Sequence, residues 1–178
     1  RRYFSPLDLI GFVADEPLLF TPGSRYEYSD TDNIVVGLMA EAVTRRSYER
    51  LLRTLVFKRL GMRRTSLPDG FLMPRPYIHG YGIAPPQPPE DLSQALSASG
   101  AWASGGIVST PGDLNRFIRA YGGGELFGDA LRTQQSQFIP GGASQPPGPG
   151  ANSAGLAIFR YRTSCGTVFG HTGSFPGD

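Results

Sequence analysis

Residues 19–33, Leu-Phe-Thr-Pro-Gly-Ser-Arg-Tyr-Glu-Tyr-Ser-Asp-Thr-Asp-Asn, lead from a Pro-Gly turn toward a helix. Thr31 or Asp32 could cap that helix, and apolar side chains recur at helical spacing over residues 34–42. This stretch therefore places the tripeptide Tyr28-Ser29-Asp30 where a loop meets a helix N-terminus.

The rest of the sequence predicts helices first and strands last. Helices are expected after caps at Ser5, Ser47 and Thr110 and over Asp129–Gln137, and strands over Ala154–Tyr161 and Thr167–Phe169. A proline-rich surface loop is expected over residues 68–91, and the side chains expected to pack inward include Leu55, Trp102, Leu114 and Ile118. This order of elements predicts a layered α+β domain.

Tyr28 and Asp30 are candidate catalytic residues. A helix N-terminus favours negative charge, so a Tyr28 phenolate could take the proton of a serine hydroxyl and later return it to a leaving group. Asp30 could orient an amide N–H or pair with a cation. A packed tyrosine followed by an ordinary turn acid explains the same tripeptide, so these residues alone assign no function.

A second candidate site, about 140 residues later, is Phe169-Gly170-His171-Thr172-Gly173-Ser174. It ends a predicted strand, where the absence of a side chain at Gly173 lets a substrate lie close to the backbone. The Ser174 N–H could donate to an oxyanion, the Thr172 hydroxyl could bind a carboxylate, and His171 could supply a proton. The alternative is a turn after an edge strand with an incidental histidine.

Four blocks of the sequence, in order, resemble the penicillin-recognising serine hydrolases, which include class C β-lactamases and D-alanyl-D-alanine carboxypeptidases. They are residues 19–33 with the helix that follows, residues 60–65, residues 103–114 and residues 164–173, the last being most similar to the carboxypeptidases. The resemblance implies a β-lactamase/transpeptidase-like α+β fold. It also implies that residues 1–178 form one incomplete domain, without the nucleophile segment and the C-terminal strands and helix.

The resemblance further implies a role for each candidate residue. Tyr28 matches the family's proton-shuttle tyrosine, and Asp30 stands where the family has asparagine. His171-Thr172-Gly173 matches the triad that binds the substrate carboxylate, and Ser174 would supply an oxyanion N–H. The implied reaction is acyl transfer through a serine ester on D-alanyl-D-alanine peptides, β-lactams or small esters, without a cofactor.

Two features depart from the family pattern. Asp30 replaces asparagine, and a carboxylate donates no hydrogen bond unless it is protonated. The Ser-x-x-Lys nucleophile motif is absent, because the single lysine is Lys58 and the residue three before it is Leu55. In the family that motif precedes the tyrosine block, so we expect it upstream of residue 1. The departures keep open an alternative, a non-catalytic binding or scaffold protein with the same fold.

Composition and charge argue against a disordered, membrane-spanning, metal-binding or nucleic-acid-binding protein. The chain is 39% hydrophobic and 18% charged, which favours a folded core, and it has no apolar run long enough to span a membrane. His79, His171 and Cys165 lack metal-ligand spacing, so we expect no metal site. Residues 44–64 are strongly basic, which could indicate nucleic-acid binding, but arginines on the solvent face of an amphipathic helix explain them.

We therefore expect a small-molecule or peptide substrate as the partner, and no nucleic acid. The resemblance, rather than any signal peptide in the sequence, implies an extracellular or periplasmic protein.

Overall fold

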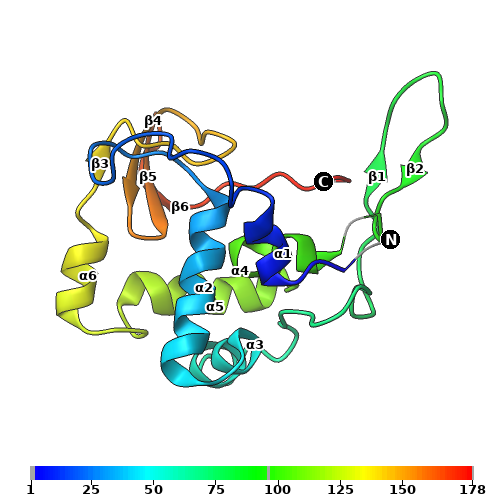
Figure 1. Ribbon diagram of the computed structural model, residues 1–178, viewed down its shortest axis with the longest axis horizontal. Coiled ribbons are helices and arrows are strands. Elements are labelled where there is room, and N and C mark those ends of the chain that lie inside the picture. Colours follow the sequence, from blue (N-terminus) through cyan, green and yellow to red (C-terminus); the bar gives the residue numbers. More distant parts are fainter. Residues whose placement is uncertain (1–2, 96, 178) are drawn as a thin grey trace. The chain divides into compact units, whose positions relative to one another are not determined.

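The computed structural model describes residues 3–95 and 97–177, and these residues form two compact units. Unit 1 is built from residues 1–16, 29–123 and 176–178, and unit 2 from residues 17–28 and 124–175. Each unit thus combines segments that are far apart in the sequence (Figure 1).

Unit 1 is mainly helical. Its elements are α1 (Pro6–Gly11), α2 (Asp30–Thr44), α3 (Tyr48–Leu51) with a π-helical continuation over Leu52–Phe57, the short strands β1 (Tyr81–Gly82) and β2 (Glu90–Asp91), a 3-10 turn over Ala98–Gly100, α4 (Trp102–Gly105) and α5 (Pro111–Gly123). β1 and β2 pair in an antiparallel manner, and they are the only strands within the described part of residues 68–91. The expectation of a largely irregular loop there is confirmed.

Short polar side chains determine where the helices begin. The Ser5 hydroxyl accepts a hydrogen bond from the Asp8 N–H, and the Asp8 carboxylate accepts one from the Ser5 N–H, which completes a capping box. α2 begins earlier than predicted. Its cap is Ser29, whose extended backbone lets the hydroxyl accept from the Asp32 N–H, so the prediction of a cap at Thr31 or Asp32 was wrong.

The core of unit 1 forms around α2. Ile34, Leu67 and Trp102 are buried together, and the Trp102 ring lies 5.2 Å from the Tyr48 ring. The Trp102 indole N–H donates to the Glu49 Oε1 atom at 2.9 Å. The expectation that Trp102 packs inside is confirmed, and its one polar atom is satisfied by a carboxylate.

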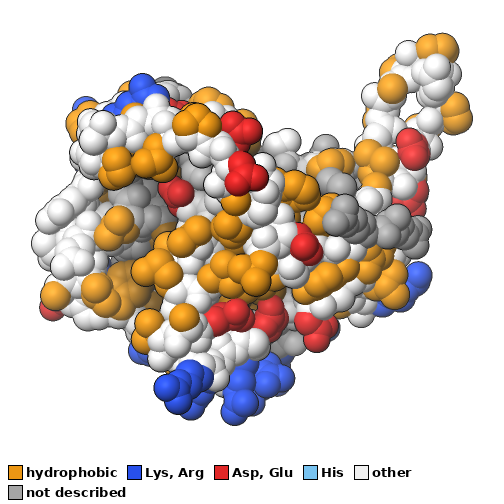
Figure 2. Space-filling view, viewed as in Figure 1, with side chains coloured by type: hydrophobic (Ala, Val, Ile, Leu, Met, Phe, Trp, Pro, Cys, Tyr) orange, Lys and Arg blue, Asp and Glu red, His pale blue; other side chains and the backbone are white. Residues whose placement is uncertain are grey.

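α2 is covered only in part within this unit, where α1, α3 and α4 contact it. Val35, Met39 and Val43 stay exposed, and Figure 2 shows hydrophobic side chains lying over α2. Leu55, Leu114 and Ile118 are also at least half exposed, contrary to the expectation for these three side chains. Helical spacing predicts a face but not whether a neighbouring element covers it.

The close approach of α4 to α2 depends on Gly37. A Cβ atom at this position would lie 2.8 Å from both the Ala103 Cβ and the Trp102 Cζ3 atoms. We expect Gly37→Ala to lower the free energy of unfolding by about 1–3 kcal/mol. Gly122→Ala in α5 is the control, because no atom lies within 4 Å of where its methyl group would stand. Equal denaturant midpoints for the two variants would contradict this packing.

A buried carboxylate ties α5 to the chain before it. Asp113 accepts hydrogen bonds from the Arg64 N–H at 2.8 Å, the Thr65 hydroxyl at 2.9 Å and the Arg116 guanidinium at 3.0 Å. Burial alone would raise the pKa of Asp113, but these donors and the Arg116 charge hold it below its ordinary value. Thr110 caps α5 as predicted, through the Asp113 N–H.

Unit 2 contains α6 (Asp129–Gln135) and a four-stranded antiparallel sheet. The strands are β3 (Ile139–Pro140), β4 (Ala151–Gly155), β5 (Ile158–Thr163) and β6 (Gly166–Gly170), in the order β3-β4-β5-β6. The single strand predicted over residues 154–161 was wrong: the chain reverses at Leu156-Ala157, and Ala154 pairs with Phe159. Ala157 adopts a φ of +53°, a turn conformation that is usually associated with glycine or asparagine rather than alanine.

Candidate active site

Tyr28 and His171 lie side by side in unit 2, with their ring centroids 5.7 Å apart and their planes inclined by 58°. Tyr28 ends the first segment of the unit, and His171 directly follows β6. The sequence motifs that carry these two rings are separated by almost the whole chain. Folding therefore brings the two rings together, whereas their catalytic roles stay predictions.

Phe159 on β5 holds both rings. Its side chain is buried at 4% exposure, and its ring centroid lies 5.1 Å from that of His171 and 6.4 Å from that of Tyr28. Phe159 pairs with Gly170 across the β5–β6 ladder, and His171 directly follows Gly170, where β6 ends. Tyr26, two residues before Tyr28, also packs edge-on against Phe159 at 6.3 Å. Antiparallel pairing and one buried ring therefore position the phenol against the imidazole.

The hydrogen bonding of His171 indicates which ring nitrogen carries its proton. The Nδ1 atom contacts the backbone carbonyl oxygen of Thr172. Because a carbonyl oxygen only accepts, Nδ1–H is the donor, and Nε2 is the acceptor in the neutral ring. The His171 residue as a whole is exposed.

Thr172, Gly173 and Ser174 follow as an irregular segment after β6. The Thr172 hydroxyl donates to the carbonyl oxygen of Pro146, so binding a carboxylate would require this proton to change partner. No atom lies within 4 Å of where a Gly173 Cβ would stand, and Ser174 is exposed. The backbone here has the open surroundings that the predicted substrate contact needs.

Asp30 belongs to unit 1, where it is the first residue of α2. Its Oδ1 atom accepts a hydrogen bond from the hydroxyl of Ser104 on α4. A carboxylate in the first turn also interacts favourably with the helix dipole. Sequence reasoning did not single out Ser104; its only signal was its place in residues 103–114, one of the four blocks of family resemblance.

The histidine and cysteine side chains considered as possible metal ligands do not form a metal centre within the described residues. Across residues 3–95 and 97–177, no three His, Cys, Asp or Glu side chains are grouped so that they could hold a metal ion. His79 shares a hydrogen bond of 2.7 Å with the Asp91 carboxylate on the exposed loop, and Cys165 is an exposed free thiol. Within the same described residues, no helix has the length and apolar character needed to cross a membrane.

Comparison with known proteins decides the family. A family model described as Beta-lactamase matches residues 1–178. The chain belongs to the beta-lactamase family. The β-lactamase/transpeptidase-like α+β fold expected from the sequence is thereby confirmed.

Two solved structures similar to this beta-lactamase-family chain are named as hydrolases of amides. A D-stereospecific amidohydrolase from Streptomyces sp. has a TM-score of 0.85 and 29% identity, over 98% of this chain and 51% of that protein. The D-amino acid amidase from Ochrobactrum anthropi SV3, solved with L-phenylalanine amide, has a TM-score of 0.87 and 25% identity, over 99% and 51%.

A putative D-alanyl-D-alanine carboxypeptidase from Salmonella schwarzengrund (strain CVM19633) is 36% identical over 66 residues, which are 35% of this chain and 15% of that protein. The chain thus spans about half the length of the two solved amidohydrolases, and the match covers a smaller part of the carboxypeptidase.

Proposed function

We propose that this chain is part of a serine hydrolase that transfers an acyl group from a D-amino acid amide or D-alanyl-D-alanine peptide to a serine and then to water. The juxtaposition of the Tyr28 phenol and the His171 imidazole carries this proposal. The chain's family and its similarity to amidohydrolases supply the reaction class.

In the proposed reaction Tyr28 moves one proton in two steps. As phenolate it takes the proton of the serine hydroxyl while the serine oxygen bonds to the substrate carbonyl carbon. As phenol it gives that proton to the departing amine when the carbonyl carbon–nitrogen bond breaks. Water then attacks the ester, which releases the acid and restores the serine. In this proposal, the attacking serine and its lysine belong to residues outside the 178 of this sequence.

His171 supports the phenol in this scheme. Its Nδ1–H is held by the Thr172 carbonyl, so Nε2 is the atom that can exchange a proton at the site. A protonated ring beside Tyr28 would stabilise the phenolate by charge. Thr172 and the Gly173-Ser174 backbone would hold the substrate carboxylate and the oxyanion.

The direct test of the reaction class is turnover by the natural full-length protein. We expect hydrolysis of D-phenylalanine amide or of a D-alanyl-D-alanine peptide, with the L-enantiomer a poorer substrate. Nitrocefin and p-nitrophenyl acetate would report β-lactamase and esterase activity in parallel. Absence of turnover on all four substrates by a folded full-length protein would contradict the proposal.

A substrate from the cell wall would place the protein in an extracellular or periplasmic location, which is part of the same proposal.

Asp30 favours one alternative, a binding or scaffold protein that has kept the fold without the chemistry. The Ser104 hydroxyl donates to this carboxylate, so as a carboxylate it offers no proton to a substrate carbonyl. We expect Asp30→Asn to keep the Ser104 contact and to add an N–H donor. In an enzyme, kcat/KM for an amide should rise about tenfold while that for a small ester changes less.

Asp32→Asn is the matched control for this change, since Asp32 lies on the same first turn of α2. If Asp30→Asn and Asp32→Asn behave alike and neither catalyses amide hydrolysis, the binding-protein alternative is the better account.

A further inference from the structure

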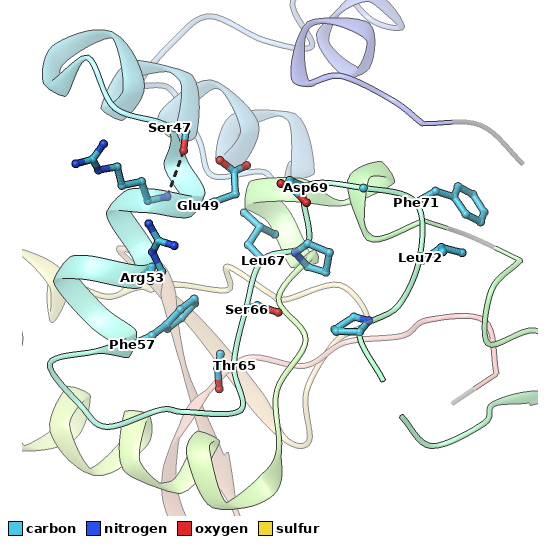
Figure 3. Close-up of a pocket in the computed structure, with 14 residues that line it drawn as sticks. Ser47, Glu49, Arg53, Phe57, Thr65, Ser66, Leu67, Asp69, Phe71 and Leu72 are labelled. Atoms are coloured by element: carbon cyan, nitrogen blue, oxygen red, sulfur yellow. Dashed lines mark hydrogen bonds between the residues drawn. The ribbon is translucent and has the colours of Figure 1, made fainter. Parts of the chain in front are cut away.

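A pocket lies wholly within unit 1, among residues that the proposed acyl transfer does not use. Its volume is about 790 Å³, which is within the usual range for small-ligand sites. One wall is the face of α3 and its π-helical continuation, which carries Glu49, Arg53 and Phe57. The facing wall is the loop over residues 65–74. Figure 3 shows Arg53 and Phe57 projecting from the helical wall and Asp69 on the loop.

The apolar part of the lining ranges from buried to exposed. Phe57 is 5% exposed and Leu67 is 6% exposed at the base, while Phe71 is half-buried and Leu72 is 65% exposed on the loop side. Such a lining removes an apolar side chain from water, and each buried methylene group favours binding. The lining therefore suits a ligand with an aromatic or aliphatic body.

The charged residues of the lining are Glu49, Arg50, Arg53 and Asp69, and among the described residues none of these four is paired with another in an ion pair. Among residues 3–95 and 97–177, Arg53 and Asp69 take part in no ion pair. Glu49 is already engaged through the Trp102 indole. A guanidinium on one wall and a carboxylate on the other thus face the same pocket, with apolar side chains between them. A ligand with both a carboxylate and an ammonium group would complement both walls.

The helical wall has an unusual backbone at this point. Residues 52–57 form a π-helical turn, and this turn carries both Arg53 and Phe57. π-Helical turns are rare and are often found at functional sites, because the wider turn re-aims side chains. This backbone geometry is independent of the charges, and it marks the same wall.

We propose that this pocket binds a small apolar zwitterion, namely a free amino acid or short peptide with an apolar side chain. The carboxylate pairs with Arg53, the ammonium group pairs with Asp69, and the side chain packs against the accessible apolar lining, which includes Phe71 and Leu72. The proposal does not depend on the acyl-transfer function, since it uses only residues of unit 1.

Trp102 provides a reporter of this pocket. It is the only tryptophan in residues 1–178, and its indole donates to Glu49 in the lining. The test is a titration of the full chain, followed by tryptophan fluorescence and calorimetry, with three probes of one shape. Phenylalanine carries both charges, phenethylamine lacks the carboxylate, and 3-phenylpropionate lacks the ammonium group.

We expect phenylalanine to bind at least about threefold more tightly than either single-charge probe, as suits partly exposed ion pairs. Arg53→Gln should remove the advantage over phenethylamine, and Asp69→Asn should remove the advantage over 3-phenylpropionate. Arg46→Gln, an exposed arginine outside the lining, should change neither. A diphenylalanine peptide tested beside phenylalanine shows whether the amino acid or the peptide binds more tightly.

Equal affinity of the three probes, or no saturable binding of any of them, would overturn the proposal. An effect of Arg46→Gln as large as that of Arg53→Gln would also overturn it, because binding would then reflect only the basic surface. Circular dichroism of each variant shows that the fold is retained, which is expected since Arg53, Asp69 and Arg46 are exposed.

Discussion

Tyr28→Phe is expected to lower kcat of the full-length protein by about 10²-fold or more, because it removes the phenolic oxygen beside His171 that the proposed proton transfer uses. Phenylalanine keeps the ring that packs on Phe159, so the fold should be preserved. Steady-state kinetics on the best D-amino acid substrate measures the loss.

Tyr26→Phe is the matched control for this loss. Tyr26 packs on the same Phe159 ring, and its hydroxyl donates a long hydrogen bond of 3.5 Å to the Ala143 carbonyl. We expect Tyr26→Phe to change kcat by less than about threefold. Near-normal turnover of Tyr28→Phe, or equal losses in the two variants, would remove Tyr28 from the mechanism.

A protein made of residues 1–178 alone is expected to form no covalent adduct with a labelled penicillin. The reason is that the sequence contains no serine followed three residues later by lysine, the arrangement that supplies the family's nucleophile. Mass spectrometry after incubation measures the adduct, and the full-length protein, treated identically, should gain the mass of one penicillin.

Retained binding without an adduct would be compatible with this expectation, because the proposed substrate-holding groups lie within the chain. Acylation of residues 1–178 would contradict it, since the nucleophile would then be one of the serines present in this sequence.

The fold could be predicted because its determinants are spread along the chain. Four short blocks in the right order indicated the family, and caps at Ser5, Ser47 and Thr110 were identifiable because a hydroxyl before a helix satisfies its first N–H groups. The juxtaposition of Tyr28 and His171 could be expected from these blocks. The physical cause, Phe159 paired with Gly170, became visible only with the strand register.

The errors have local physical causes. Ser29, rather than Thr31 or Asp32, caps α2, since several hydroxyl and carboxylate side chains compete for the same N–H groups. The reversal at Leu156-Ala157 contains none of the glycine or asparagine that usually marks a tight turn, so one long strand was predicted instead of two.

Contacts between side chains also could not be predicted from the sequence. Periodicity places Leu55 on the apolar side of its helix, but the structure leaves it 58% exposed. The hydrogen bonds from Ser104 to Asp30 and from Thr172 to Pro146 join residues far apart in the sequence. Such pairs depend on tertiary packing, and they decide how Asp30 and Thr172 can act.

The central claim is that the Tyr28 phenol and the His171 imidazole act in one step of one reaction. A double-mutant cycle in the full-length protein, with Tyr28→Phe, His171→Ala and the combined variant, tests it by comparing kcat. The account predicts that the double variant loses about as much activity as the more damaging single variant, a coupling of about 1 kcal/mol or more between neighbouring groups. Losses that simply multiply would show that the two side chains act independently and would contradict the account.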